Sequence, residues 1–172
     1  GWRPPGCWPD CDMLPLGRIG VKFGQSRQTR FTPDEQKTLL TLWSIFRSPL
    51  ILGAELPSLD EATLRLLTNR DVLRLNRHSF GARQIVRDDA HAVWVSQDED
   101  GSRYAALFNL SEEPREVSLE LRELEGETFA CRELWSGEER TAQETLSCVI
   151  EPHGARLFRC KKKKKTGLSF RQ

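Results

Sequence analysis

The chain has 172 residues, of which 38% are hydrophobic and 30% are charged. This composition predicts a soluble, globular protein that holds one full domain, or a small domain plus part of another. No apolar run approaches the roughly 20 residues that a membrane-spanning helix needs. The formal net charge is +1, and without the five lysines at 161–165 it would be −4. The slightly acidic remainder argues against a nucleic-acid-binding body, which needs a clustered basic face.

The stretch "CWPDCDMLPLG", residues 7–17, is the first with a chemical pattern. Asp10 and Asp12 form a D-x-D pair near Trp8, and three interpretations fit it. The carboxylates could hold a divalent metal, as in sugar-nucleotide transferases. They could bind or cleave a sugar that stacks on the indole, or Asp10 could cap the loop while Trp8 packs in a core. A long loop without acidic residues follows, and barrel enzymes place their active sites where a strand ends in such a loop.

Residues 32–48 are predicted to form a helix. Thr32 is the expected N-cap, Pro33 the first helical residue, and Glu35 completes a capping box. Pro49 disfavours helical backbone in the residue before it, so the helix should end near there. An apolar stripe at helical spacing is formed by Leu39, Leu42, Trp43 and Phe46.

The run "PLILG", residues 49–53, is short and unbroken in its apolar character, which predicts a strand buried on both faces. A second helical segment, "SLDEATLRLLTNRDVLRLN", follows with Ser58 as its expected cap. The order of loop, helix, buried strand and helix is the alternation of a parallel α/β sheet.

From about residue 82 the apolar period changes from 3.6 to 2. Val117, Leu119 and Leu121 alternate with polar residues, and "HAVWV" and "YAALFNL" should be central strands because they are more uniformly apolar. Turn signals at short intervals predict an antiparallel β-sandwich of about seven or eight strands. The boundary with the helical part is expected near His78–Ala82.

Residues 161–172 open with five consecutive lysines, which repel one another and predict a disordered polybasic tail. A solvated tail is favoured over one that contacts a membrane or a nucleic acid. The predicted organisation is therefore a helical part at residues 1–80, an antiparallel β domain at 81–160 and the tail at 161–172.

The cysteines and histidines indicate neither a disulfide framework nor a metal site. The five cysteines are odd in number and widely spaced, so we expect reduced thiols, with a Cys131–Cys148 bridge between strands as the alternative. The three histidines are equally scattered and lack zinc-ligand spacing. No cofactor and no metal are expected.

Several stretches together resemble glycoside hydrolase family twenty-seven, the α-galactosidases. Its members carry a W-N-D-P-D-M-L-type motif after the seventh barrel strand, then a helix with "LW", an "SPL" strand and an "N-x-D-V-x-x-x-N" helix. The matching stretches here are "WPDCDMLPLG", "TLLTLWSIFRSPLILGAEL" and "LLTNRDVLRLNRHSFG". "ALFNLS", "ELWSGE" and "EPHGARLFR" are similar to the family's C-terminal β domain. The chain departs from the motif at Pro9 and Cys11, which leaves the exact substrate open.

The resemblance implies a fold and an activity. The fold would be the last two βα units of a (β/α)8 TIM barrel, incomplete here, followed by an antiparallel β-sandwich. The activity would be that of a retaining, exo-acting hydrolase that cleaves terminal α-galactosyl residues from an oligosaccharide or glycoconjugate. Retaining enzymes use two carboxyl groups about 5–5.5 Å apart. In this family they follow the fourth and sixth strands, so we expect no catalytic residue in this chain and no activity from it alone.

The resemblance also implies roles for the residues of the D-x-D stretch. Asp12 and Met13 match positions that line the galactose pocket. Asp10 is expected to hold the loop, and Trp8 to pack behind the pocket. The four residues are therefore the predicted substrate-binding set.

Two other functions stay open. The β domain could be a stand-alone carbohydrate-binding or structural module, with Trp135 as its candidate platform, although core or edge packing is favoured for that side chain. A metal-dependent transferase would use Asp10 and Asp12, but no Gly-rich phosphate loop follows a strand. No membrane or nucleic-acid partner is expected. We expect the true N-terminus to lie upstream, so the sequence indicates no compartment; it also leaves open the oligomeric state and the choice between galactose and N-acetylgalactosamine.

Overall fold

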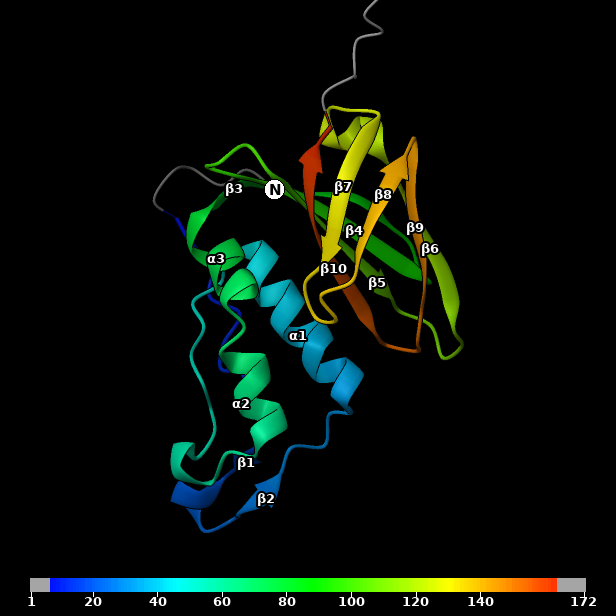
Figure 1. Ribbon diagram of the computed structural model, residues 1–172. Helices are drawn as coiled ribbons and strands as arrows, with labels where there is room; N and C mark the ends of the chain where they lie inside the picture. Colours follow the sequence, from blue (N-terminus) through cyan, green and yellow to red (C-terminus); the bar gives the residue numbers. More distant parts are fainter. Residues whose placement is uncertain (1–6, 164–172) are drawn as a thin grey trace, which may run out of the picture.

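The computed structural model describes residues 7–163, with helices in the first half and strands in the second (Figure 1). The first half contains β1 (Arg18–Ile19), β2 (Arg27–Gln28), α1 (Pro33–Phe46), α2 (Glu61–Leu67) and α3 (Arg70–His78), with 3-10 helices at Val21–Phe23 and Leu56–Ser58. β1 and β2 form a small antiparallel hairpin within the long loop. None of the described helices is long and apolar enough to cross a membrane.

The predicted capping box opens α1. The Glu35 amide donates to Thr32 Oγ1 at 3.2 Å, and the Thr32 amide donates to Glu35 Oε2 at 2.7 Å. The helix ends at Phe46 because Arg47 takes a left-handed backbone conformation with φ 60°. The Arg47 side chain then donates to the carbonyl oxygens of Asn76 and Arg77, which ties the end of α1 to α3.

The second predicted helix is divided into α2 and α3, and its predicted cap is wrong. Asp60, not Ser58, caps α2 by accepting from the Thr63 amide at 2.8 Å. Ser58 instead lies in a 3-10 helix and donates to Glu55. Asn69 begins α3 by accepting from two backbone amides of the first turn, so the helical pattern restarts there.

The run at 49–53 is not a strand buried on both faces. It contributes one parallel bridge, between Leu14 and Leu52, flanked by Leu14 N–H to Ile51 O at 2.7 Å and Gly53 N–H to Leu14 O at 2.9 Å. Ile51 is 47% exposed. Burial on both faces requires paired neighbours and covering layers, and within residues 7–163 only the Leu14 segment pairs with this run.

The second half is an eight-stranded antiparallel sheet that folds into a sandwich. Its strands are β3 (Ser79–Arg87), β4 (His91–Asp98), β5 (Arg103–Asn109), β6 (Arg115–Glu120), β7 (Thr128–Glu133), β8 (Glu139–Gln143), β9 (Thr145–Ile150) and β10 (Ala155–Lys162). They pair in the order β3-β4-β5-β10-β7-β8-β9-β6. In Figure 1 the β7-β8-β9-β6 part lies across β4 and β5.

Apolar side chains of the two layers meet between them. Val93 and Leu107 from β4 and β5 lie in one buried cluster with Val117, Leu119 and Phe129 from the other layer. The predicted antiparallel β-sandwich is thereby confirmed, as is the central place of the two most apolar strands.

Two local predictions in this half need correction. Leu121 is buried as expected, but it belongs to a 3-10 helix at Leu121–Leu124 and not to the strand. Lys161 and Lys162 were predicted to be disordered, yet they belong to β10 and pair with Ala130 and Phe129. Strand pairing with β7 supplies the backbone order that the charge repulsion was expected to prevent. The rest of the predicted tail, from residue 164, lies outside the described residues.

The helices pack on the outer face of the sandwich. Leu40 and Ile45 of α1 and Leu75 of α3 share a buried cluster with Tyr104 and Leu157 of the sheet. Hydrogen bonds between the halves are made by Asn69 Nδ2 to Leu134 O (2.8 Å), Trp135 Nε1 to Thr41 Oγ1 (3.0 Å) and Thr38 Oγ1 to His153 O (2.7 Å).

A buried carboxylate also joins the two halves. The side chain of Asp98, at the end of β4, is fully buried. Arg74 of α3 donates to it through Nε at 2.8 Å and Nη2 at 2.7 Å, and the Tyr104 hydroxyl donates at 2.6 Å. Burial by itself raises the pKa of Asp98, but the hydrogen bonds from Arg74 and Tyr104 outweigh it and lower that pKa to about 2.

Replacing Asp98 by Asn should lower the free energy of unfolding by about 3 kcal/mol at neutral pH, because the nearby guanidinium groups of Arg74 and Arg159 then face no buried negative charge. Urea denaturation of the unmodified and variant chains measures this difference in the free energy of unfolding. Asp89→Asn, in an exposed turn, is the control and should change stability by less than about 0.5 kcal/mol. Equal losses in the two variants would contradict the account.

The Asp98 carboxylate also makes the free energy of unfolding depend on pH. Its folded pKa lies below the unfolded value of 3.8, so its contribution is complete above pH 3.8 and is lost as the pH falls towards 2. The expected loss is about 2 kcal/mol over that window. The difference in unfolding free energy between the unmodified chain and Asp98→Asn should therefore shrink on acidification. A difference that stayed constant down to pH 2 would contradict the lowered pKa.

Candidate functional site

The D-x-D stretch is held against the helical half by its backbone. Leu14 and Leu16, just after it, are buried in the cluster under the helices. The Cys11 amide donates to Ser48 Oγ at 2.9 Å, next to the end of α1. The position of the loop is thus set on both sides of Asp12.

Asp12 lies at a turn with a fixed conformation. Its φ of 71° is left-handed, a region in which Asp and Asn are tolerated better than most residues. The Asp12 amide donates to Asp10 Oδ1 at 2.8 Å, and the Asp12 carbonyl accepts from Trp43 Nε1 at 3.0 Å. Asp10 therefore holds the turn, and the Trp43 indole fixes it from α1.

The Asp12 carboxylate is exposed and only partly occupied. Oδ1 accepts from the Met13 amide at 2.6 Å, whereas Oδ2 has no hydrogen-bond partner among residues 7–163. With respect to the described residues, this oxygen is thus available to accept hydrogen bonds from a ligand hydroxyl group.

Met13 and Trp8 add apolar surface near this carboxylate. Both side chains are 53% exposed. A side chain at Gly53 would begin 3.2 Å from the Met13 Cβ, so glycine there leaves room for the Met13 side chain. The Arg47 guanidinium lies over the Trp8 ring, 5.7 Å from its centre. The indole therefore lies at the surface by the end of α1.

The described part of this stretch offers carboxylate acceptors and apolar surface. Residues 7–163 contain no group of three or more His, Cys, Asp or Glu side chains arranged to hold a metal ion. Asp10 uses one carboxylate oxygen on the backbone, and the neighbouring surface is apolar. A carboxylate acceptor beside apolar and aromatic surface is a combination that sugar-binding sites use.

Trp135 is not an exposed platform in this structure. Its indole donates to Thr41 Oγ1, and its ring packs against the cluster beneath α1. The side chain therefore joins the helices to the sheet. The core or edge packing favoured for it in the sequence is confirmed.

Family models match both halves of the chain. A model described as "Alpha galactosidase A" matches residues 3–78, and one described as "Alpha galactosidase C-terminal beta sandwich domain" matches residues 88–160. α-Galactosidase D of Emericella nidulans is 35% identical over 160 residues, which cover 89% of this chain and 23% of the relative.

Solved structures agree with these matches. The β-L-arabinopyranosidase of Geobacillus stearothermophilus has a TM-score of 0.88 and 46% identity over 95% of this chain and 39% of that one. A variant of that enzyme in complex with arabinose has a TM-score of 0.86 and 45% identity, covering 91% and 38% of the two chains.

Fold and matches together define the class: the chain joins the end of a glycoside hydrolase catalytic domain to a C-terminal antiparallel β sandwich. It belongs to glycoside hydrolase family 27, and the family resemblance in the sequence is confirmed. The chain spans 23% of the length of the Emericella relative and 39% of the Geobacillus structure.

Trp43→Phe tests the turn at Asp12. Losing the indole hydrogen bond should lower the free energy of unfolding by about 1 kcal/mol and speed hydrogen exchange at the Met13 amide, because Asp12 is no longer fixed from α1. Exchange measured by NMR reports both quantities. Trp135→Phe also loses an indole hydrogen bond but should leave the Met13 amide unchanged. Faster Met13 exchange in both variants would show that the Asp12 turn responds only to overall stability.

Proposed function

We propose that this chain is the C-terminal part of a retaining, exo-acting glycoside hydrolase that cleaves terminal α-galactosyl residues. It contributes one wall of the sugar pocket and none of the catalytic carboxylates. The observation that carries the proposal is the turn at Asp12, which holds in a fixed position a carboxylate oxygen that has no partner among residues 7–163.

The geometry supports a division of roles among the predicted site residues. Asp12 accepts hydrogen bonds from sugar hydroxyls, and a charged acceptor makes such bonds stronger than a neutral one. Met13 gives apolar contact to the sugar ring, Asp10 keeps the turn closed, and Trp8 with Arg47 forms the outer edge of the site. We assign Asp10 to the turn and not to the acid–nucleophile pair, because its Oδ1 accepts from the Asp12 amide.

A second substrate is favoured by one comparison. The Geobacillus relative at 46% identity is a β-L-arabinopyranosidase. β-L-arabinopyranose has the ring-hydroxyl arrangement of α-D-galactopyranose and lacks only the hydroxymethyl group. A carboxylate that accepts hydrogen bonds from ring hydroxyls can bind both sugars. Asp12 is therefore compatible with either substrate and does not discriminate between them.

The β domain has a structural role in this proposal. Its outer face carries α1 and α3 through the buried Asp98–Arg74 pair and the Trp135 indole. The helices in turn hold the loop with Asp12. This assignment replaces the stand-alone binding module, for which Trp135 was the candidate platform.

The proposal is tested in a chimera in which residues 7–163 replace the matching region of the Geobacillus arabinopyranosidase. The chimera should hydrolyse nitrophenyl β-L-arabinopyranoside or α-D-galactopyranoside. Asp12→Asn should lower its kcat/KM about 10–100-fold, the effect of weakening a charge-assisted hydrogen bond to substrate. Asn tolerates the left-handed turn, so the backbone is preserved.

Asp10→Asn is the matched control. The amide oxygen of Asn still accepts from the Asp12 amide, so kcat/KM should fall less than about threefold. If kcat/KM fell equally in both variants of an active chimera, the assignment of Asp12 to the sugar pocket would be wrong. If the Asp10→Asn variant lost all turnover, Asp10 would have to be considered a catalytic residue.

A further inference from the structure

Two buried cysteines face each other across the strands β7 and β10. The pairing register places Cys131 opposite Cys160, on the inner face of the sandwich. Both are free thiols, 2% and 0% exposed. The alternative partner considered in the sequence, Cys148, lies on β9, and β8 separates that strand from β7.

The hydrogen-bond pattern shows which kind of pair they form. Leu134 N–H donates to Leu157 O at 2.7 Å, and Lys163 N–H donates to Thr128 O at 3.0 Å. Hydrogen-bonded pairs alternate with non-hydrogen-bonded ones along an antiparallel ladder, so Cys131 and Cys160 occupy a non-hydrogen-bonded position. At such positions the Cα atoms are about 4.5 Å apart and the side chains are closest, which lies within the range that a disulfide spans.

An arginine lies beside Cys131 on the third strand. Arg140 of β8 is paired with Cys131 in the register, so both side chains lie on the same face. Its guanidinium carbon lies 4.8 Å from the centre of the Phe158 ring. Arg140 Nε and Nη2 are buried and have no hydrogen-bond partner within the described part of the chain. The positive charge of a guanidinium next to a thiol favours the thiolate, which is the reactive form.

The two thiols differ in acidity. A hydrogen bond from Cys160 lowers the pKa of Cys131 against the opposing effect of burial, and the charge of Arg140 lowers it further. The hydrogen bond to Cys131 and burial raise the pKa of Cys160. These directions favour Cys131 as the thiol that reacts first and Cys160 as the one that attacks it afterwards.

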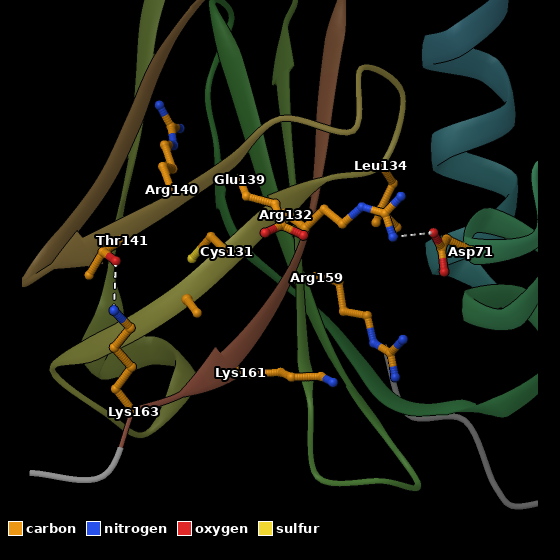
Figure 2. A pocket seen from close by; sticks show the side chains of 11 residues that line it. Asp71, Cys131, Arg132, Leu134, Glu139, Arg140, Thr141, Arg159, Lys161 and Lys163 are labelled. Carbon is orange, nitrogen blue, oxygen red and sulfur yellow. Dashed lines mark hydrogen bonds and ion pairs between the residues drawn. The ribbon is translucent and has the colours of Figure 1, made fainter.

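A hollow lies on the outer face of the strands that carry this pair, opposite to the two thiols. Its volume is about 650 Å³, and its lining includes Arg132, Thr141 and Arg159, whose side chains are drawn in Figure 2. Cys131 itself is 2% exposed, so a small, neutral oxidant is better suited to reach it than a bulky or charged one.

We propose that Cys131 and Cys160 are a redox-modification site that a peroxide converts reversibly to a disulfide. The Cys131 thiolate attacks one oxygen of hydrogen peroxide and breaks the O–O bond, and the hydroxide that leaves takes the thiol proton to become water. The Cys160 thiolate then attacks the sulfur of the resulting sulfenic acid. The S–O bond breaks, and the second hydroxide takes the Cys160 proton. Two thiols and one peroxide give one disulfide and two waters, and a dithiol reverses the change.

The disulfide would fasten the last strand of the sandwich. It would close a loop that runs from β7 through β8 and β9 to β10. Closing this loop reduces the conformational entropy of the unfolded chain and so stabilises the folded one. Oxidation should therefore raise the melting temperature of the chain by roughly 5–10 °C. The inference does not depend on the sugar chemistry proposed above, because none of its residues lies near Asp12.

The first experiment uses the unmodified 172-residue chain. The folded chain is treated with hydrogen peroxide, the free thiols are alkylated, and the peptides are mapped by mass spectrometry. The expected product is a Cys131–Cys160 cross-link that dithiothreitol removes. A cross-link to Cys148, or one that appears only above the urea midpoint of unfolding, would overturn the proposal.

Variants then test the role of Arg140. Arg140→Gln should slow formation of the cross-link about tenfold, because the thiolate loses its positive neighbour. Arg132→Gln is the matched control, since Arg132 follows Cys131 directly but pairs with Asp71 on the outer face of the sheet (Figure 2). In Cys160→Ser, a sulfenic-acid trap such as dimedone should label Cys131. Equal rates in the two arginine variants, or trapping at another cysteine, would contradict the mechanism.

Discussion

A single buried carboxylate sets how the two halves of this molecule are joined. An ionised Asp98 without partners would be strongly destabilising in the interior, so the structure must supply cations to it. Arg74 provides two hydrogen bonds from α3, Tyr104 provides one from β5, and Arg159 lies 3.6 Å away on β10. The pair can only form with α3 in one position against the sheet, which makes it a constraint on geometry as well as a contribution to stability.

A series of contacts leads from this pair to the turn at Asp12. Asn76, on the same helix as Arg74, donates to Ser48 O at 2.9 Å. Ser48 Oγ accepts from the Cys11 amide. The loop is thereby positioned from α3 as well as by the Trp43 indole of α1. In the function proposed here, the β sandwich acts on the sugar pocket only through these helices.

The sequence predicted what depends on local interactions. The capping box of α1 involves residues three positions apart, and the strands of the sandwich follow from alternation of apolar side chains. The start of α2 was misplaced because Ser58 and Asp60 are both good caps, and only the fold selects between them. Burial of residues 49–53 was overestimated because burial depends on neighbouring strands, which an apolar run does not reveal.

For the site, the sequence indicated the residues but not their geometry. The D-x-D pair was recognisable, whereas the left-handed turn and the Trp43 hydrogen bond needed the packing of α1. No sequence pattern indicated the Asp98–Arg74 pair, because its two residues lie 24 positions apart. The Cys131–Cys160 pair was missed because a strand order in which β10 neighbours β7 cannot be deduced from spacing.

The measurement that tests the central claim most directly is hydrolysis of nitrophenyl α-D-galactopyranoside by the folded 172-residue chain alone. We expect no turnover above the uncatalysed rate, because in the proposed function the chain supplies a pocket wall without the two catalytic carboxyl groups. Turnover that is lost in Asp12→Asn or Asp10→Asn would contradict it. The D-x-D pair would then perform the chemistry itself.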